Sequence, residues 1–442
     1  MASKYQLLPS IQQLLLLLFS TTVLTTSSSN NHEILQRGFS ATPDPSSSLR
    51  FQPILTDPTS TFSFGFLRIN SSLLDLSVIH LPSSFPLWRA IPSRPVSWSH
   101  STSLSFNGTT LHLSDTTTTP VPSWSTPTPA DVIGDGYKLV LLNSSNLQIA
   151  HKDQNQAVPW QSFDYPSDTI VQHQNFTSQS TLSSTNQRFS MSLGPTYLGL
   201  YMQHLGVPYR PMYWKRTALQ AKAQIVLSQG PIYARLEPTG FLGLYQNETA
   251  IVDVISFDTF NAGIKKNLRR LTLEHDGNLK AYYWNGSDWV SDFEAISQIC
   301  DLPATCGAYS LCHVKEQQCG GCVDNSTDGG CFPADSGDLC GSGGGGFHVV
   351  RRAGVDLANK DLIGFQRVES LQECEMLCER NCSCWGAVYN NVSRDCGIAF
   401  ASYGVWNSRR WRSRGEDEMG MPYKDLKSSS FRSIELANSF RK

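Results

Sequence analysis

The segment Leu104-Ser-Phe-Asn-Gly-Thr-Thr-Leu-His-Leu113 decides the fold class of the first part of this chain. Apolar and polar residues alternate on both sides of Asn107-Gly108, as they do in two half-buried strands joined by a tight turn. Asn-Gly suits the positive φ angles of a type I′ hairpin turn. The segment therefore predicts an antiparallel β-hairpin.

Similar patterns recur up to the first cysteine, Cys300. Leu271 and Leu273 precede Asp276-Gly277, and the apolar runs 139–142 and 147–150 flank a polar turn. Phe62-Ser-Phe-Gly-Phe66 alternates in the same way. We see no long helical stripe and no internal repeat in this region, and closely spaced hairpins predict a β-barrel, prism or sandwich.

A Thr/Ser/Pro-rich insertion covers residues 116–129. Val121 and Trp124 are its only apolar residues that could enter a core. We expect a solvent-exposed loop between strands, open to O-glycosylation.

The composition excludes several classes of protein. Of the 442 residues 40% are hydrophobic and only 16% charged, so the chain is too apolar to be disordered throughout. The 35 basic and 37 acidic residues nearly balance, which argues against nucleic acid as a partner. A surface built from Ser, Thr and Asn, together with 12 cysteines, points outside the cytosol.

The first residues resemble a secretory signal. Lys4 precedes an apolar core, and small residues follow it, so we expect a signal peptide over residues 1–26. The alternative is a membrane anchor, but Thr21 and Thr22 interrupt the apolar run. We therefore predict a secreted protein of the apoplast or cell wall.

Acceptor sequences for N-glycosylation agree with export, since Asn-x-Ser/Thr occurs nine times. Two of them, Asn381 and Asn391, lie among cysteines, where disulfide packing hinders transfer. The predicted sites are Asn70, Asn107, Asn143, Asn175, Asn247, Asn285, Asn325 and Asn391.

All 12 cysteines lie in the last third of the chain, in two groups of six, as two closed disulfide frameworks require. The groups are Cys300, Cys306, Cys312, Cys319, Cys322 and Cys331, and then Cys340, Cys374, Cys378, Cys382, Cys384 and Cys396. Spacing alone leaves 15 connectivities for each group.

Three local patterns within the cysteine-rich part need an interpretation of their own. Cys319-Gly-Gly-Cys322 has the spacing of a zinc or redox site, but an exported chain favours structural disulfides. The glycine run 341–346 lacks the Lys-Ser/Thr of a phosphate loop and predicts a flexible loop. Leu371 to Arg380 predicts a short helix, and Cys382-Ser-Cys384 predicts a strand.

Four segments, in this order, resemble the S-domain family of plant receptor-like proteins. They are Trp160-Gln-Ser-Phe-Asp-Tyr-Pro-Ser-Asp-Thr169, Arg270-Leu-Thr-Leu-Glu-His-Asp-Gly-Asn-Leu279, Cys300 to Cys312, and Glu373 to Cys384. They are similar to the end of a bulb-type lectin region, an S-locus glycoprotein segment, the start of an EGF-like module and a PAN (apple) module. The resemblance is nearest to the kinase-less, PAN-containing members of the group.

This resemblance implies a mainly β fold with two β-prism (bulb-lectin-like) domains followed by small disulfide-rich EGF-like and PAN modules. The expected parts are a lectin-like domain over 27–158, an S-locus glycoprotein or second lectin-like domain over 159–298, an EGF-like module over 299–335, a PAN module over 340–426 and a basic tail over 427–442. Met419 to Leu426 is the candidate for the closing PAN strand.

The resemblance also implies a disulfide pairing. In the first group it joins Cys300 to Cys312 and Cys306 to Cys319, which leaves Cys322 with Cys331. In the second group it joins Cys374 to Cys396 and Cys378 to Cys384, which leaves Cys340 with Cys382.

The chain departs from mannose-binding bulb lectins, which carry Gln-x-Asp-x-Asn-x-Val-x-Tyr. Where a remnant of that motif would lie, only Asn143 and Asn146 are present, so the residues of any carbohydrate site are unknown. Kinase motifs are absent from the sequence as well.

Enzyme motifs are also missing, and the available carboxylates have simpler interpretations. Asp164 and Asp168 suggest a glycosidase pair, but they flank a turn, where carboxylates usually bond to local donors. Asp292 and Glu294 are interpreted as solvated. No cofactor is implied.

Three tryptophans, Trp160, Trp284 and Trp289, could stack on sugars, although packing in the core or along a prism axis is the simpler interpretation. We expect a non-catalytic extracellular recognition glycoprotein, related to recognition of pollen or to cell-surface signalling. Its partners would be a glycan, a cell-surface or cell-wall protein, or a receptor-like kinase ectodomain. The alternatives are a secreted hydrolase, a decoy that binds protein without sugar affinity, and a structural wall glycoprotein, which repeats would favour.

Overall fold

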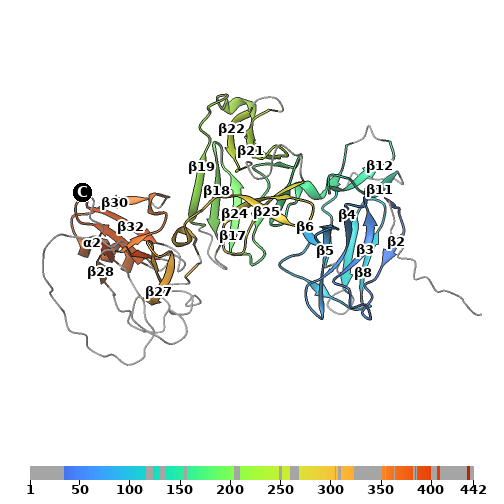
Figure 1. The fold of residues 1–442 in the computed structure, drawn as a ribbon, viewed down its shortest axis with the longest axis horizontal. Coiled ribbons are helices and arrows are strands. Elements are labelled where there is room, and N and C mark those ends of the chain that lie inside the picture. The colour runs from blue at the N-terminus through green and yellow to red at the C-terminus, as the bar shows by residue number, and fades with distance from the viewer. Residues whose placement is uncertain are drawn as a thin grey trace, which may run out of the picture.

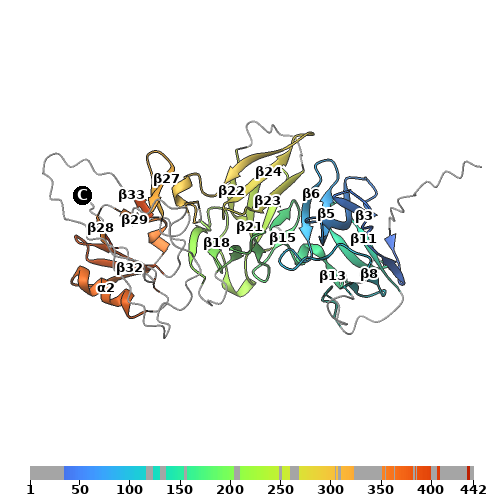
Figure 2. The same cartoon turned by 90° about the horizontal axis from the view of Figure 1, so that it is seen from below.

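The computed structural model describes most of the chain between residues 34 and 399. The described residues are 34–115, 123–129, 136–153, 157–203, 210–247, 251–258, 268–303, 305–306, 310–322, 351–353, 355–362, 364–381, 384, 386–399, 406–408 and 436–438. The expected signal peptide lies outside them. Among these residues no helix has both the length and the hydrophobicity needed to cross a bilayer. The fold is mainly β, as predicted, and its parts follow one another along the long axis (Figures 1 and 2).

The first part of the chain forms three antiparallel sheets, each built from one early strand and a later three-stranded meander. The first sheet holds β3 (Phe51–Thr56), β4 (Phe62–Arg68), β5 (Leu73–His80) and β6 (Phe85–Arg89), with β7 (Val96–Ser97) on β5. The second holds β2 (Phe39–Ala41), β8 (Thr102–Phe106), β9 (Leu111–Asp115) and β10 (Trp124–Ser125). The third holds β1 (Ile34–Leu35), β11 (Tyr137–Leu141), β12 (Leu147–His151) and β13 (Trp160–Gln161).

The second part repeats this topology. One sheet holds β16 (Leu182–Ser183), β17 (Phe189–Leu193), β18 (Tyr197–Met202) and β19 (Met212–Thr217). The next holds β15 (Asn175–Phe176), β20 (Tyr233–Glu237), β21 (Phe241–Tyr245) and β22 (Ile251–Ser256). The last holds β14 (Thr169–Val171), β23 (Arg269–Leu273), β24 (Leu279–Trp284) and β25 (Trp289–Glu294). In both parts the first early strand joins the last meander, so the two parts share one nested architecture.

The predicted hairpins form, but their turns are not of type I′. Phe106 pairs with Leu111 across a four-residue loop, in which Gly108 takes φ 106° while Asn107 does not have a positive φ. A type I′ turn needs two residues between the strands, both with positive φ. The Asn107 side chain instead accepts hydrogen bonds from the amides of Thr109 and Thr110, which makes a wider turn.

The three meanders of the second part also repeat in sequence, which corrects the expectation that the chain lacks repeats. Each carries a leucine, a turn and a tyrosine at matching places. The three copies are Leu193-Gly-Pro-Thr-Tyr-Leu-Gly-Leu-Tyr201, Leu236-Glu-Pro-Thr-Gly-Phe-Leu-Gly-Leu-Tyr245 and Leu273-Glu-His-Asp-Gly-Asn-Leu-Lys-Ala-Tyr282. These repeats are units of a closed prism, so they do not argue for a structural wall protein.

Each part closes around its own apolar core. In the first part Trp88, Trp124 and Trp160 come from the last meander strand of the three different sheets and meet edge to face, with ring centroids 6.0–6.4 Å apart. Three sheets that converge on one axis make a β-prism. The insertion over 116–129 is therefore not simply a solvated loop, because β10 within it carries Trp124 to this axis and Thr126 is buried.

The strand pairing also places the division between the two parts. β13 pairs with β12 and so belongs to the first prism. The division falls after Gln161 rather than at 158/159, and β14 at Thr169 opens the second prism.

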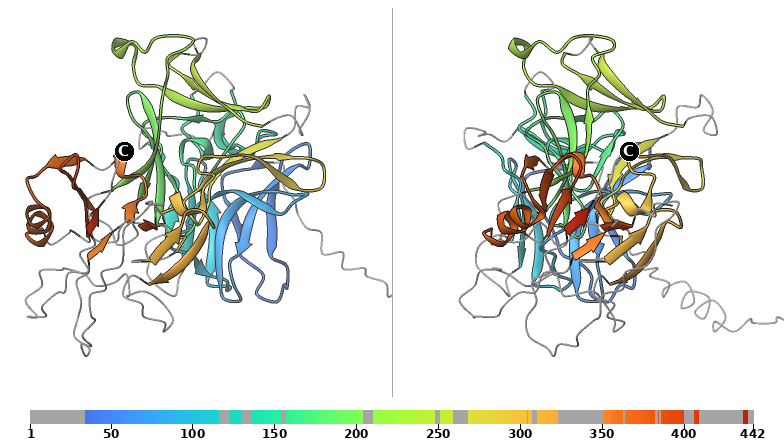
Figure 3. Two further views of the ribbon diagram at one scale, coloured as in Figure 1. Left: turned by 60° about the vertical axis from the view of Figure 1, so that its left-hand side comes forward. Right: turned by 90° about the vertical axis from the view of Figure 1, so that its left-hand side faces the viewer.

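The cysteine-rich part contains short strands and helix α2 (Leu371–Glu379), which lies at the edge of its module in the views of Figure 3. The helix confirms the prediction, and the Ser370 hydroxyl caps it by accepting from the Glu373 amide. Cys384 precedes strand β31 and does not lie in a strand, which corrects that expectation, whereas Cys382 is outside the described residues.

The remaining strands are β26 (Ser310–His313), β27 (Gln318–Cys322), β28 (Arg351–Ala353), β29 (Val355–Leu357), β30 (Phe365–Arg367), β31 (Gly386–Asn390), β32 (Asp395–Ala399), β33 (Trp406–Ser408) and β34 (Leu436–Asn438). The 3-10 turns are η1 (Ser162–Asp164), η2 (Leu227–Gln229), η3 (Ile299–Asp301) and η4 (Lys360–Leu362).

Part of the segment 427–442, expected as a basic tail, is a paired strand. β34, within residues 427–442, pairs in parallel with β31 and β28. The segment Met419 to Leu426, the expected closing strand, lies outside the described residues, as does the glycine run 341–346.

Candidate functional site

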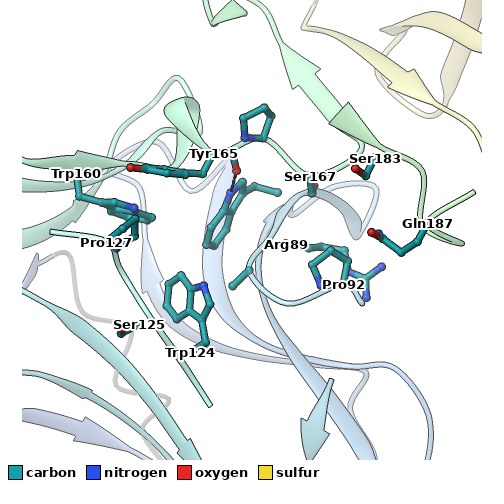
Figure 4. Close-up of a pocket in the computed structure, with 13 residues that line it drawn as sticks. Arg89, Pro92, Trp124, Ser125, Pro127, Trp160, Tyr165, Ser167, Ser183 and Gln187 are labelled. Atoms are coloured by element: carbon teal, nitrogen blue, oxygen red, sulfur yellow. Dashed lines mark hydrogen bonds between the residues drawn. The ribbon is translucent and has the colours of Figure 1, made fainter. Parts of the chain in front are cut away.

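A pocket of about 410 Å³ opens at the axis of the first prism, where the second prism begins. In Figure 4 aromatic side chains gather on one side of it and polar ones on the opposite side. The aromatic side is formed by Trp88, Trp124, Trp160 and Tyr165, with Pro127 and Pro166. The polar side is formed by Arg89, Ser167, Ser183 and Gln187, and Ser125 lies at the rim. We call this the axial pocket. Its volume is in the range of small-molecule sites.

Trp160 lines the axial pocket and is only 2% exposed. Tyr165, which is 48% exposed, stacks nearly parallel to it, with an interplanar angle of 14° and ring centroids 6.3 Å apart. The Trp88 indole N–H donates to the Tyr165 carbonyl at 2.8 Å and fixes this loop, as Figure 4 shows. The Trp160 indole N–H has no hydrogen-bond partner among the described residues, although it is buried.

The polar side of the axial pocket combines the two prisms. Ser183 and Gln187 come from β16 and from the turn before β17, both in the second prism. Arg89 forms an ion pair at 2.9 Å with Asp75, whose side chain is fully buried. Burial raises the pKa of Asp75, although Arg89 and the Ile91 amide oppose that shift. The charge of Arg89 is thus already engaged within the protein.

The two carboxylates that suggested a glycosidase pair differ in their surroundings. Asp164 is exposed and accepts a hydrogen bond from the Gln161 side-chain amide at 3.0 Å. Asp168 is buried and accepts from the hydroxyls of Ser167 and Thr169. Burial raises the pKa of Asp168. Both are held by neighbouring side chains, so the local structural role is the one that their geometry supports.

The remnant position of the mannose motif has a structural role as well. Asn146 is buried, donates to the Gln161 side chain at 2.8 Å and accepts from Ser162 and the Phe163 amide. Asn143 is exposed. Asn146 therefore anchors β13 to its neighbouring turn and is not free to hold a sugar.

Trp284 and Trp289 lie at the seam between the prisms. His80 of the first prism contacts both rings edge to face, with ring centroids 4.8 and 5.3 Å apart. Arg270 of the second prism lies between the rings of Phe85 and Tyr282, 3.8 Å from each centroid. This seam accounts for the two tryptophans by packing.

Asp292 is not solvated, which corrects the sequence interpretation. Its carboxylate accepts from the Arg269 guanidinium at 2.6 Å, and the two side chains are 4% and 1% exposed. Burial raises the pKa of Asp292 even so. Glu294, by contrast, is exposed and lies 3.5 Å from Lys280. The interpretation as solvated is thus confirmed for Glu294 and wrong for Asp292, whose partner Arg269 lies on a strand that does not pair with β25.

The cysteines form four described disulfides: Cys300–Cys312, Cys306–Cys319, Cys374–Cys396 and Cys378–Cys384. Cys319 is therefore engaged with Cys306, which leaves no thiol there for a zinc or redox pair with Cys322. Cys331, Cys340 and Cys382 lie outside the described residues, so the six-bond assignment as a whole stays a prediction.

The predicted glycosylation sites that the structure describes are all exposed, as attachment requires, whereas Asn381 is half-buried, and modification of each site remains a prediction. They are Asn70, Asn107, Asn143, Asn175, Asn247, Asn285 and Asn391. Asn325 lies outside the described residues.

Sequence reasoning missed Trp88, Trp124 and Tyr165 as pocket residues. A usable signal was present, because Trp88, Trp124 and Trp160 recur at a constant interval of 36 residues. Such an interval indicates one residue per structural repeat.

Comparisons with known proteins agree with this architecture. The family model for D-mannose binding lectin matches residues 86–192, which include every residue that lines the axial pocket. The S-locus glycoprotein domain matches 245–326 and the PAN domain matches 340–408.

Individual relatives show how far the likeness extends. A PAN domain-containing protein of Arabidopsis thaliana is 45% identical over 365 residues, which cover 82% of this chain and 72% of that protein. A G-type lectin S-receptor-like serine/threonine-protein kinase of the same plant is 26% identical over 348 residues, covering 74% of this chain but only 38% of the kinase. A solved two-domain lectin, the Scilla campanulata agglutinin, is 16% identical, and the match covers 60% of this chain and 96% of that lectin at a TM-score of 0.20. The chain therefore belongs to the plant family that joins a lectin-type domain, an S-locus glycoprotein domain and a PAN domain, together with the PAN domain-containing protein of Arabidopsis thaliana.

Proposed function

We propose that this protein is a non-catalytic, extracellular recognition glycoprotein that binds a glycan, either free or carried by a cell-surface or cell-wall protein. The observation that carries the proposal is the duplicated prism with one aromatic pocket where its two halves meet. Ligand pockets favour domain junctions, where two rigid bodies fix the geometry of one site.

Secretion to the apoplast or cell wall follows from the same proposal. Disulfide-rich modules and exposed Asn-x-Ser/Thr acceptors are typical of exported proteins. The kinase relatives contain a matching segment within longer chains, and they suggest a receptor-like kinase ectodomain as a partner and pollen or cell-surface signalling as the process.

The experiment is a binding survey with the secreted full chain on an array of plant glycans, combined with capture of proteins from cell-wall extracts. Binding to a defined set of glycans supports the proposal. Absence of glycan binding, together with capture of one defined protein, would replace it with a protein-recognition role.

A turnover assay tests the non-catalytic part. Incubation with the bound glycans should release no new reducing ends. Release that disappears in Asp164→Asn or Asp168→Asn would instead establish a hydrolase.

A further inference from the structure

We propose that the axial pocket is the glycan site and that it holds one neutral pyranose ring, with the Trp160 indole N–H donating to an oxygen of the sugar. This inference rests on the proposed glycan-binding function and names where and how that function is carried out. It places the site on the prism axis and away from the outer sheet faces.

The aromatic side of the pocket suits the apolar face of a pyranose. Trp124 is half-buried and Tyr165 is exposed, so both present ring surface to the pocket. An aromatic face carries negative charge density and attracts the weakly positive C–H groups of a sugar ring. The Trp88 hydrogen bond to the Tyr165 carbonyl fixes the backbone that carries the stacking ring, so little backbone entropy is lost on binding.

The unpartnered Trp160 N–H is the second, independent observation. A buried donor without an acceptor is unfavourable, and each such group in a folded protein calls for an explanation. Trp160 lines the axial pocket, and its N–H has less than 1 Å² of exposed surface, so a ligand oxygen accepts this hydrogen bond there once the exposed Tyr165 ring that stacks on Trp160 moves. A hydroxyl or ring oxygen of a sugar stacked on the aromatic side supplies that acceptor.

The polar side selects a neutral ligand. The Ser167 hydroxyl already donates to Asp168 and the Gln187 amide nitrogen to the Ser184 carbonyl. The pocket therefore offers sugar hydroxyls the Ser183 hydroxyl, the Ser167 oxygen as an acceptor and the remaining groups of the Gln187 amide. Arg89 is the one charged residue that lines the pocket among the described residues, and Asp75 already pairs with it. An acidic sugar would therefore lose its hydration without gaining a free cation.

A proline-rich peptide is the competing ligand, because aromatic grooves also bind extended proline helices. Those sites are long grooves that follow several residues of peptide. The axial pocket is instead a single cavity with opposed apolar and polar sides, which fits one amphipathic ring better. Oligoproline is therefore included in the test.

The experiment measures affinity of the secreted full chain and its variants for the neutral glycans found on the array, for acidic glycans and for oligoproline, by calorimetry. Tyr165→Ala removes the exposed stacking ring, Ser183→Trp fills the pocket from the second prism, and Trp160→Phe removes the N–H but keeps a ring. Tyr233→Ala is the matched control, since Tyr233 stacks on Tyr245 with the same interplanar angle of 14°, away from the pocket.

We expect Tyr165→Ala to weaken binding of the neutral glycan by about tenfold and Trp160→Phe by about fivefold. Ser183→Trp should abolish binding, whereas Tyr233→Ala should stay within about twofold of wild type. In a ¹⁵N-Trp spectrum, the indole signal that Trp160→Phe removes should shift when the glycan is added.

Each other result has one meaning. Unchanged glycan binding in all three pocket variants overturns this inference but leaves the proposed function intact. Binding of oligoproline in place of any glycan, lost in Tyr165→Ala, overturns both. Preference for acidic glycans would contradict the inference that the pocket holds a neutral sugar and would leave the proposed glycan-binding function intact.

Discussion

The indole N–H of Trp289 in the second prism donates to the hydroxyl of Ser83 in the first prism at 2.9 Å, across 206 residues of sequence. Around this hydrogen bond lie the ring contacts of His80 and Phe85 with Trp289. The two prisms are therefore joined by directional contacts as well as by apolar packing.

A double-mutant cycle at this pair tests the seam. Trp289→Phe and Ser83→Ala should each lower the free energy of unfolding by about 1 kcal/mol, since each removes one partner of the bond. Because both changes remove the same hydrogen bond, the double variant should lose less than the sum. Thermal denaturation of the three variants gives the coupling energy, and strictly additive losses would show that the bond contributes nothing.

Removing one partner of the buried ion pair between Arg269 and Asp292 should lower the free energy of unfolding. Arg269→Met leaves an unpaired buried carboxylate and should lower the free energy of unfolding by about 3–5 kcal/mol. Arg269→Met with Asp292→Leu removes both charges and should recover most of that loss. Chemical denaturation measures both variants. A change below about 1 kcal/mol in the single variant would support the solvated Asp292 that the sequence suggested.

His80 predicts a loss of stability in acid. Burial lowers its pKa from 6.5 to about 4 in the folded protein. As the pH falls from 6.5 toward 4, the unfolded chain takes up a proton that the folded protein does not, so stability is lost in that window and is retained above it. The loss should be about 1 kcal/mol near pH 5.5 and about 3 kcal/mol near pH 4.

The measurement compares wild type with His80→Asn by thermal unfolding across this range. Asparagine can keep a hydrogen bond to Ser83, whose hydroxyl lies 2.8 Å from His80 Nδ1, but it cannot titrate. The variant should show a flatter decline of stability with falling pH. Equal slopes for the two proteins would assign the acid sensitivity to other groups.

The disulfide assignment predicts the products of non-reducing peptide mapping. The four described bonds should appear together with Cys322–Cys331 and Cys340–Cys382. Any bond that joins a cysteine before residue 332 to one after residue 339 would contradict the division into two closed groups.

Much of this fold could be predicted from the sequence because its signals are local. Alternation around Leu104 and Leu113 requires only that one face of a strand is buried, and the helix at Leu371 carries its own cap in Ser370. Turn types were predicted less well, because Asn107-Gly108 is compatible with both short and longer loops, and the pairing of Phe106 with Leu111 selects the longer one.

The sequence by itself determined that the chain is mainly β, that its cysteines form two late groups, and which residues alternate toward a core. Only the tertiary structure decided which buried groups meet. The alternation of apolar and polar residues in a strand indicates that Trp160 and Trp289 are apolar positions. It does not indicate that Trp160 contacts Trp88 and Trp124 on the prism axis, or that Trp289 contacts His80 between the two prisms. The physical reason is that closing three sheets brings together side chains from strands far apart in sequence, so the axial pocket exists only after both prisms have closed.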